Sequence, residues 1–281
     1  MTQIGMEESA SSSYDIELNS NKRPVLSLKN VAIVESMIRN DSSYRDSTNV
    51  DKRPEFFSKD VKSKKTGVLL HRKGDIRYGG STAYWASKLY LMLIEKTPLA
   101  LASDKAVADS AKALGYGSNY EKTVIFCLVS SIDRENSTHL NASVDGRKQM
   151  TSWIMDYYSN GTLLNEIQSP KKCCYGLIEK LSTGITAVRS GTKKRQNFSF
   201  ATKFCHYTSY YLFEGTPEQD NFSIYDNVME KAIKKYNPLL KKVSFFCKYE
   251  AYIDAIDTIR IGSISRNGFD HLLWYYYKGR N

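Results

Sequence analysis

The chain has 281 residues with a hydrophobic fraction of 41%, which is enough to bury a sizeable core in one large domain or two small ones. Its formal net charge is +10, and 20 of its residues are tyrosine. The basic surplus favours a polyanionic partner or an anionic membrane surface, and the tyrosines favour nucleic acid because their rings stack on bases. We find no signal peptide and no apolar run of membrane-spanning length, so we expect a cytoplasmic protein without a membrane partner.

The cysteines are five in number and form no CxxC pair, and the four histidines are widely scattered. Zinc sites and iron–sulfur clusters are usually built from closely spaced thiol or imidazole ligands. We therefore predict no metal site and no metal cluster, and reduced, mostly buried thiols. The cysteines are Cys127, Cys173, Cys174, Cys205 and Cys247.

The N-terminal part of the chain is polar. Residues 1–24 are rich in serine, so we predict a disordered tail followed by a helical domain over residues 25–281. Residues 26–40 have helical apolar spacing and predict the first helix. The polar and charged residues 41–67 indicate a loop, and the short apolar run in residues 67–80 indicates a strand or short helix that enters a turn.

From Ser81 onward the apolar spacing is strongly helical. Ser81 and Ser103 are candidate N-caps, and Gly115 is a candidate stop signal. Strict two-residue alternation is scarce, so we predict a mostly α protein with about eight to ten helices. Residues 120–132 are apolar enough for a buried helix, but their pattern also fits a strand. The remaining predicted helices span residues 81–98, 103–117, 145–161, 171–184, 200–213, 223–237, 249–262 and 268–279.

Lys203 lies in an unusually aromatic segment. If residues 200–213 are helical, Lys203 shares a face with Phe200, Phe204 and Tyr207 at three- and four-residue spacing. Partial desolvation among these rings would favour the neutral amine, which is a nucleophile toward an electrophilic carbon such as a sugar C1′. The alternative is a surface lysine whose stem packs on the rings while its ammonium reaches water.

Asp226 stands at the start of the next apolar helix. As an N-cap it would accept a backbone hydrogen bond, and the terminal amides would keep it ionised. An ionised carboxylate near an amine nucleophile can also stabilise a cationic sugar transition state. Both interpretations, a cap and a catalytic group, fit the sequence.

These two segments together resemble the helix-hairpin-helix DNA glycosylases of the 8-oxoguanine glycosylase type. "ATKFCHYT" matches the family's helix that opens with the Schiff-base lysine, which places the nucleophile on Lys203. "FSIYDNVM" matches its catalytic aspartate motif on Asp226, 23 positions later, and the polar insert "EGTPEQDN" lies between them. The resemblance covers residues 180–236. It implies a mostly α fold of two helical subdomains with the active-site cleft between them.

The sequence departs from the family pattern just before the lysine. The family carries glycines just before the lysine, and their amides approach a DNA phosphate closely. Here residues 199–201 read Ser-Phe-Ala. The basic run just upstream could grip the backbone electrostatically instead, or it could be a solvated loop. Together with a second basic stretch, the candidate DNA-binding residues are Lys193, Lys194, Arg195, Arg72, Lys73 and Arg77.

The last predicted helix matches the position from which the family lines its base pocket. Phe269, His271 and Trp274 are therefore candidates to stack on or hydrogen-bond to a base rotated out of the duplex. Phe269 is the better stacking candidate, because His271 and Trp274 share another face of the helix. Such an aromatic helix is also typical of a protein core.

The resemblance implies a DNA glycosylase, with or without β-lyase activity, that acts on double-stranded DNA as a monomer and needs no cofactor. The family's default substrate is an oxidised purine, in a repair role. A hypermodified base in invading phage DNA, in a defence role, is the other substrate hypothesis. Two other functions fit the sequence: a non-catalytic DNA-binding protein that kept the fold, and a helical interaction protein without a nucleic-acid role.

Overall fold

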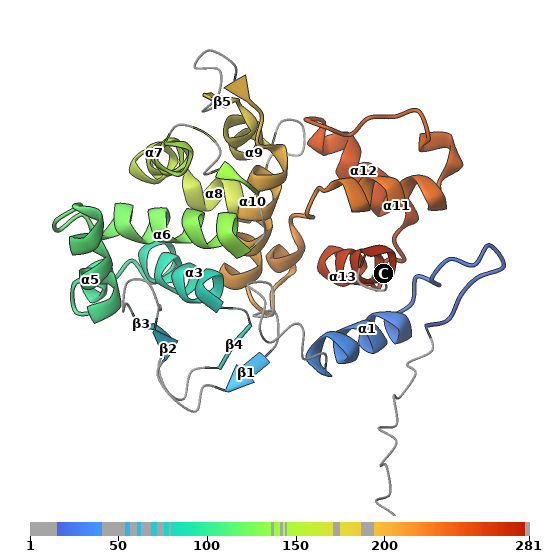
Figure 1. Cartoon of the computed structure of the whole chain (residues 1–281), viewed down its shortest axis with the longest axis horizontal. Helices are drawn as coiled ribbons and strands as arrows, with labels where there is room; N and C mark the ends of the chain where they lie inside the picture. Colours follow the sequence, from blue (N-terminus) through green and yellow to red (C-terminus); the bar gives the residue numbers. More distant parts are fainter. Residues whose placement is uncertain are drawn as a thin grey trace, which may run out of the picture.

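The computed structural model describes residues 16–40, 80–135, 138–140, 143, 145–170, 175–186 and 194–278, and the backbone of four short strands between residues 54 and 78. In this part of the chain the protein is mostly helical, as predicted, with twelve α-helices (Figure 1). Two of them, α4 and α8, are very short, which explains why apolar spacing predicted fewer.

The long helices are α1 (Leu28–Asn40), α3 (Gly80–Leu93), α5 (Lys105–Leu114), α6 (Tyr120–Glu135), α7 (Gly146–Ser159), α10 (Phe198–Leu212), α11 (Asn227–Tyr236), α12 (Tyr249–Ile259) and α13 (Arg266–Lys278). The short ones are α4 (Leu99–Ala102), α8 (Leu163–Gln168), α9 (Gly176–Ser182) and the 3₁₀ turns η3 (Pro217–Asp220) and η4 (Pro238–Leu240). The strands are β1 (Pro54–Phe56), β2 (Val61–Lys62), β3 (Leu69–His71), β4 (Ile76–Tyr78), β5 (Ile185–Thr186) and β6 (Lys194–Arg195).

The strands form three antiparallel pairs, β1 with β4, β2 with β3 and β5 with β6. The predicted loop over residues 41–67 is therefore wrong in part, because β1 and β2 lie within it. In the first pair Glu55 is opposite Arg77. Strands of two or three residues are too short to show alternation, so only their pairing across the chain reveals them.

The predicted tail also differs from the structure over its last residues. Ile16 is buried, and Leu18 and Pro24 form an isolated bridge. The side chain of Asn30 on α1 is fully buried and holds this turn: its Oδ1 accepts from the Glu17 amide at 3.0 Å, and its Nδ2 donates to the Glu17 carbonyl at 2.9 Å. A polar composition predicted disorder here, but a side chain from the following helix satisfies the backbone.

Several helix ends follow local chemistry. Gly115 ends α5 with φ +70°, in the left-handed region that glycine adopts readily. The N-cap of α5 is Asp104, not Ser103, and its carboxylate accepts from the Ala106 amide at 2.9 Å. Ser81 lies within the first turn of α3, not before it. The apolar segment at residues 120–132 is helical, as part of α6.

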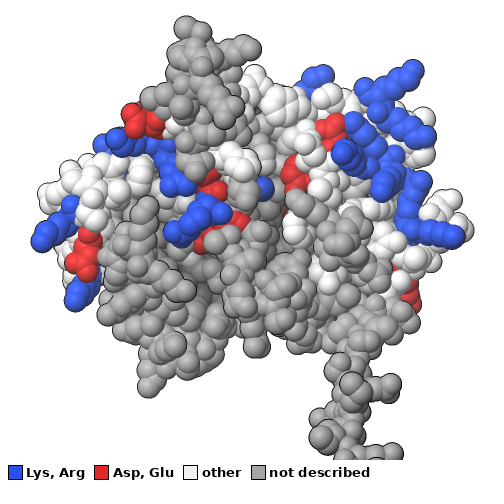
Figure 2. Space-filling model, viewed as in Figure 1, with Lys and Arg blue, Asp and Glu red and all other residues white. Residues whose placement is uncertain are grey.

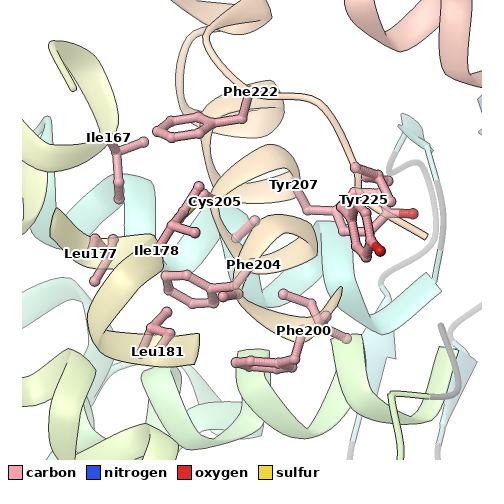
Figure 3. Packing of buried hydrophobic residues seen from close by; sticks show 14 of the residues in the cluster. Ile167, Leu177, Ile178, Leu181, Phe200, Phe204, Cys205, Tyr207, Phe222 and Tyr225 are labelled. Atoms are coloured by element: carbon pink, nitrogen blue, oxygen red, sulfur yellow. The ribbon is translucent and has the colours of Figure 1, made fainter. Parts of the chain in front are cut away.

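The helices lie in two groups, which Figure 1 shows side by side. We call α3 to α10 the first helix group, and α1 with α11, α12 and α13 the second helix group. In the first, Figure 3 shows Phe204 of α10 pointing toward Ile178 and Leu181 of α9. One buried apolar cluster runs through both groups, and the rings of Phe198 and Tyr225 are 4.6 Å apart where the groups meet. None of the helices in the described residues has the length and apolar character needed to cross a membrane.

Candidate functional site

The candidate nucleophile lies at the edge of the most buried helix face. Lys203 is half-buried on α10, while its neighbours Thr202 and Phe204 have no exposed surface. Phe200 and Tyr207, which the helical spacing places on the same face, are buried as well, at 1% and 8% exposure. The helix predicted around Lys203 is therefore confirmed, as α10.

The candidate carboxylate is the N-cap of α11. Asp226 has an extended backbone, and its Oδ1 accepts a hydrogen bond from the Met229 amide at 2.8 Å. This confirms the capping interpretation. Within the described residues Oδ2 accepts no hydrogen bond. Because the cap fixes χ1 and points the carboxylate along the helix start, one oxygen is held in place while the other stays available to a ligand.

A hydrogen bond joins the two candidate segments. The Tyr225 amide donates to Thr202 Oγ1 at 3.1 Å, and Thr202 Oγ1 in turn donates to the Ser199 carbonyl at 3.1 Å. Thr202 is the residue before Lys203, and Tyr225 is the residue before Asp226. The fold thus brings together the backbones of two residues that are 23 positions apart in sequence. Sequence reasoning did not single out Thr202 or Tyr225.

The ring of Tyr225 packs at the boundary between the two helix groups. Its ring centroid lies 4.6 Å from that of Phe198 and 5.2 Å from that of Tyr252 on α12. Its hydroxyl donates to Glu230 on α11. Burial, together with the neighbouring charge of Glu230, raises the pKa of the Tyr225 hydroxyl, so it stays a neutral donor.

Glu230 is in turn ionised. Burial would raise the pKa of Glu230, but hydrogen bonds from Lys234 and Tyr225 outweigh this effect and hold it below its ordinary value. Lys234 Nζ lies 2.5 Å from Glu230 Oε1. The first turn of α11 therefore carries a fixed anionic group besides Asp226, and its charge is shared with Lys234 and Tyr225.

His206 ties α10 to two other parts of the chain. It is 1% exposed, its Nδ1 donates to the Phe222 carbonyl at 2.9 Å, and its Nε2 lies 3.0 Å from Asn267 Oδ1 at the start of α13. These contacts anchor the segment that leads to Asp226. The sequence offered a histidine in a helix but no sign of its partners, which are 16 and 61 positions away.

The predicted DNA-binding residues are only partly described. Lys194 and Arg195 form β6, which pairs with β5 in a hairpin between α9 and α10. Arg77 lies on β4. The side chains of these three residues lie outside the described part of the chain, as do Lys193, Arg72 and Lys73 altogether.

The predicted base pocket on α13 needs correction. Phe269 has no exposed surface and packs in the core with Leu272 and Leu273. A ring with no exposed face offers nothing on which a base can stack, so the core interpretation holds for Phe269. His271 and Trp274 are half-buried and stay candidates. Hydrophobic spacing alone could not tell which face of this helix, rich in aromatic residues, is turned inward.

A cleft of about 610 Å³ opens where α9, the start of α10 and the start of α12 meet. Phe198 lines it, and Phe198 also contacts Tyr225, the residue before Asp226. Its exposed polar lining comes from Glu179, Thr183, Gln196, Lys248 and Glu250. Lys203 and Asp226 do not line this cleft, so it adjoins the candidate site without containing it.

Among the described residues no group of three or more His, Cys, Asp or Glu side chains is placed to hold a metal ion. The buried thiols follow the predicted pattern in part: Cys205 is fully buried and Cys127 half-buried, whereas Cys247 is exposed.

In comparisons with known proteins, the chain matches no family model, no curated protein and no solved structure.

Proposed function

We propose that the protein is a DNA glycosylase with a helix-hairpin-helix glycosylase-like fold. In this proposal the two helix groups are its two helical subdomains, and the active-site cleft lies between them. The observation that carries the proposal is the hydrogen bond from the Tyr225 amide to Thr202 Oγ1. It joins the residue before Lys203 to the residue before Asp226, the two positions where the chain resembles the glycosylase motifs.

The proposed reaction begins with a nucleotide rotated out of the duplex. The amine of Lys203 forms a bond to C1′ while the bond between C1′ and the base nitrogen breaks, and the electron pair leaves with the base. The attached amine then loses a proton and the C1′–O4′ bond breaks, with a proton going to O4′, so the opened sugar forms a Schiff base with Lys203. This Schiff base permits strand cleavage by β-elimination if the enzyme is bifunctional. The attack requires the neutral amine of Lys203.

Asp226 stabilises the positive charge that develops on the sugar. Its cap hydrogen bond holds Oδ1 at the N-terminus of α11. The free Oδ2 is then a preorganised negative charge, which lowers the barrier without reorganising during the reaction.

Double-stranded DNA is the proposed partner, and the protein is proposed to act as a cytoplasmic monomer. The basic residues of the β5–β6 hairpin and of the β3–β4 region are proposed to contact phosphates. His271 and Trp274 remain the proposed base-pocket residues. The proposed substrate is an oxidised purine or a hypermodified base, in repair or in defence against phages.

Borohydride trapping tests the proposed nucleophile. The purified chain is incubated with duplexes and phage genomic DNAs that contain different modified bases, and abasic sites and covalent adducts are scored. Lys203→Gln should abolish both the adduct and strand cleavage. The matched control is Lys180→Gln, because Lys180 is another lysine of the first helix group whose Nζ lies over an aromatic ring, 5.2 Å from the Trp153 centroid. An undiminished adduct in Lys203→Gln would refute the assignment.

The second candidate is a non-catalytic DNA-binding protein that kept the fold. One observation favours it: residues 199–201, which stand where the family has its hairpin glycines, lie inside the first turn of α10. Their amides are therefore part of a helix start and not of an open glycine loop. Tight duplex binding with no abasic sites on any substrate of the panel would decide for this candidate.

A further inference from the structure

The solvent face of α11 is unusually basic. Met229, Ala232 and Ile233 form its buried side, so the residues opposite them face water. The stretch from Asn227 to Lys248 holds six lysines against a single acidic residue, Glu230. It therefore contributes a net charge of +5, half of the formal +10 of the whole chain.

Most of these lysines have no acidic partner. Lys234 pairs with Glu230. The other five are exposed, and none of them forms an ion pair within the described residues. Figure 2 shows Lys and Arg side chains gathered over the side of the molecule where Figure 1 labels α11 and α12. We call these five the α11 lysine surface: Lys231, Lys235, Lys241, Lys242 and Lys248.

This surface is hollowed along α11. A groove of about 440 Å³ is lined by Lys231, Lys234 and Lys235 from α11 and by Tyr277 from α13. Lys235 Nζ lies 3.9 Å from the centre of the Tyr277 ring. The Lys235 ammonium therefore lies over the ring face, and a contact of this kind is weak enough for the ammonium also to bind an anion.

We propose that the α11 lysine surface binds the sugar–phosphate backbone of duplex DNA beside the reacting nucleotide. The choice of DNA as the polyanion rests on the proposed function. α11 begins at Asp226, so Lys231 and Lys235 lie roughly 8 and 14 Å further along its axis. One strand of B-DNA presents a phosphate about every 3.4 Å of axis, which puts these lysines in reach of phosphates roughly two to four nucleotides away.

This assignment gives the two helix groups separate roles on the DNA. The β5–β6 hairpin of the first group and the lysine surface of the second group would hold the backbone on either side of the site between them. Lysines act as point charges, so this grip would add affinity without reading sequence.

A salt titration tests the proposal on the full chain. The variant carries Lys231→Gln, Lys235→Gln and Lys242→Gln. The matched control removes three exposed lysines of the first helix group that form no ion pair in the described residues: Lys96→Gln, Lys105→Gln and Lys112→Gln. Kd for an undamaged duplex is measured at several salt concentrations, and the single-turnover excision rate at saturating enzyme.

We expect the α11 variant to reduce the slope of log K against log salt by about two to three and to weaken binding about tenfold or more at physiological salt. The control should keep both the wild-type slope and the wild-type saturated excision rate. An unchanged slope in the α11 variant, or equal reductions in both variants, would overturn the proposal.

A third arm distinguishes DNA from an anionic membrane. If the α11 variant loses binding to phosphatidylserine vesicles but binds the duplex like wild type, the surface serves lipid headgroups and the proposal is wrong. Failure of the glycosylase function is a separate outcome. If the wild-type protein binds duplex through these lysines but excises no base, the proposed function is wrong and the DNA-binding role of the α11 lysine surface is retained. Absence of duplex binding by the wild type overturns both.

Discussion

The acidic side chains of α6 in the first helix group and the lysines around α11 in the second group use charge in opposite ways. In the first group acidic side chains are buried and surrounded by donors. Asp133 on α6 is 3% exposed, and its carboxylate accepts from the Leu140 amide at 2.7 Å and from Arg147 Nη2 at 2.7 Å. Glu135, at the end of the same helix, accepts from the Ser81 amide at 3.0 Å and from the hydroxyl and amide of Thr82 at the start of α3.

In the second group the lysines of α11 and of the segment after it point into solvent and are mostly unpaired in the described part of the chain. A buried charge is tolerable only where partners compensate its desolvation, so those of the first group hold helices together. Exposed lysines contribute little to folding and remain free to bind an anion. We therefore expect removal of a buried carboxylate of α6 to cost stability, and removal of exposed α11 lysines to cost binding.

The largest expected loss of stability comes from replacing Asp133. Asp133→Ala removes a buried carboxylate that partners the half-buried Arg147 guanidinium and the Leu140 amide, and should lower the free energy of unfolding by about 3–5 kcal/mol. Urea denaturation measures this. Asp109→Ala, at an exposed position on α5, is the control and should stay within about 0.5 kcal/mol. Similar losses in both variants would contradict the comparison.

The next effect is pH-dependent and concerns Asp104, which pairs with Lys88 at 2.7 Å. Burial would raise the pKa of Asp104, but the hydrogen bonds and charge of Lys88 and the Tyr84 hydroxyl hold it below its ordinary value of 3.8. A depressed carboxyl pKa contributes stability above 3.8 that is lost as pH falls through the folded-state pKa.

Lys88→Met leaves this carboxylate without its main partner. It should cost about 1–3 kcal/mol at neutral pH, because a buried acceptor loses its donor. Acid unfolding should also begin at higher pH than in the wild type. Urea unfolding curves at several pH values measure both changes, and identical curves for the variant and the wild type would show that the pair does not support the fold.

A smaller effect on stability separates the two roles of Asp226. Asp226→Ala removes the α11 cap and should cost about 1 kcal/mol, whereas Asp226→Asn keeps a capping oxygen and should cost only a few tenths. If Asp226 acts on the transition state, both variants should lose on the order of two to four decades in excision rate. An Asn variant that excises at the wild-type rate would leave Asp226 as a helix cap alone.

The smallest expected losses of stability come from replacing the α11 lysines. Lys235→Gln should cost about 0.5–1 kcal/mol, because it loses the contact with the Tyr277 ring. Lys242→Gln, at a position without such a contact in the described residues, should leave the melting temperature unchanged. A large loss for Lys242 would mean that this surface is structural, which would weaken the contrast between the two groups.

Sequence alone predicted much of the helical content and two features of the site. Apolar periodicity and local end signals depend on neighbouring residues, so the class, the stop at Gly115 and the cap at Asp226 could be predicted directly. The aromatic face around Lys203 followed from the same periodicity. The proximity of the two motifs was inferred only through resemblance, because nothing local in either segment encodes it.

Tertiary structure decided the rest. The contact between Tyr225 and Thr202, the buried position of Phe269 and the pairing of β1 with β4 all join segments that are distant in sequence. The sequence shows that α11 contains lysines, but only the packing shows that they lie on its solvent face. Only the structure shows that Asp226 caps the helix and that Glu230 pairs with Lys234. A helix is stabilised by hydrogen bonds within four residues, so its pattern is local, whereas burial and charge pairing depend on which surfaces finally meet.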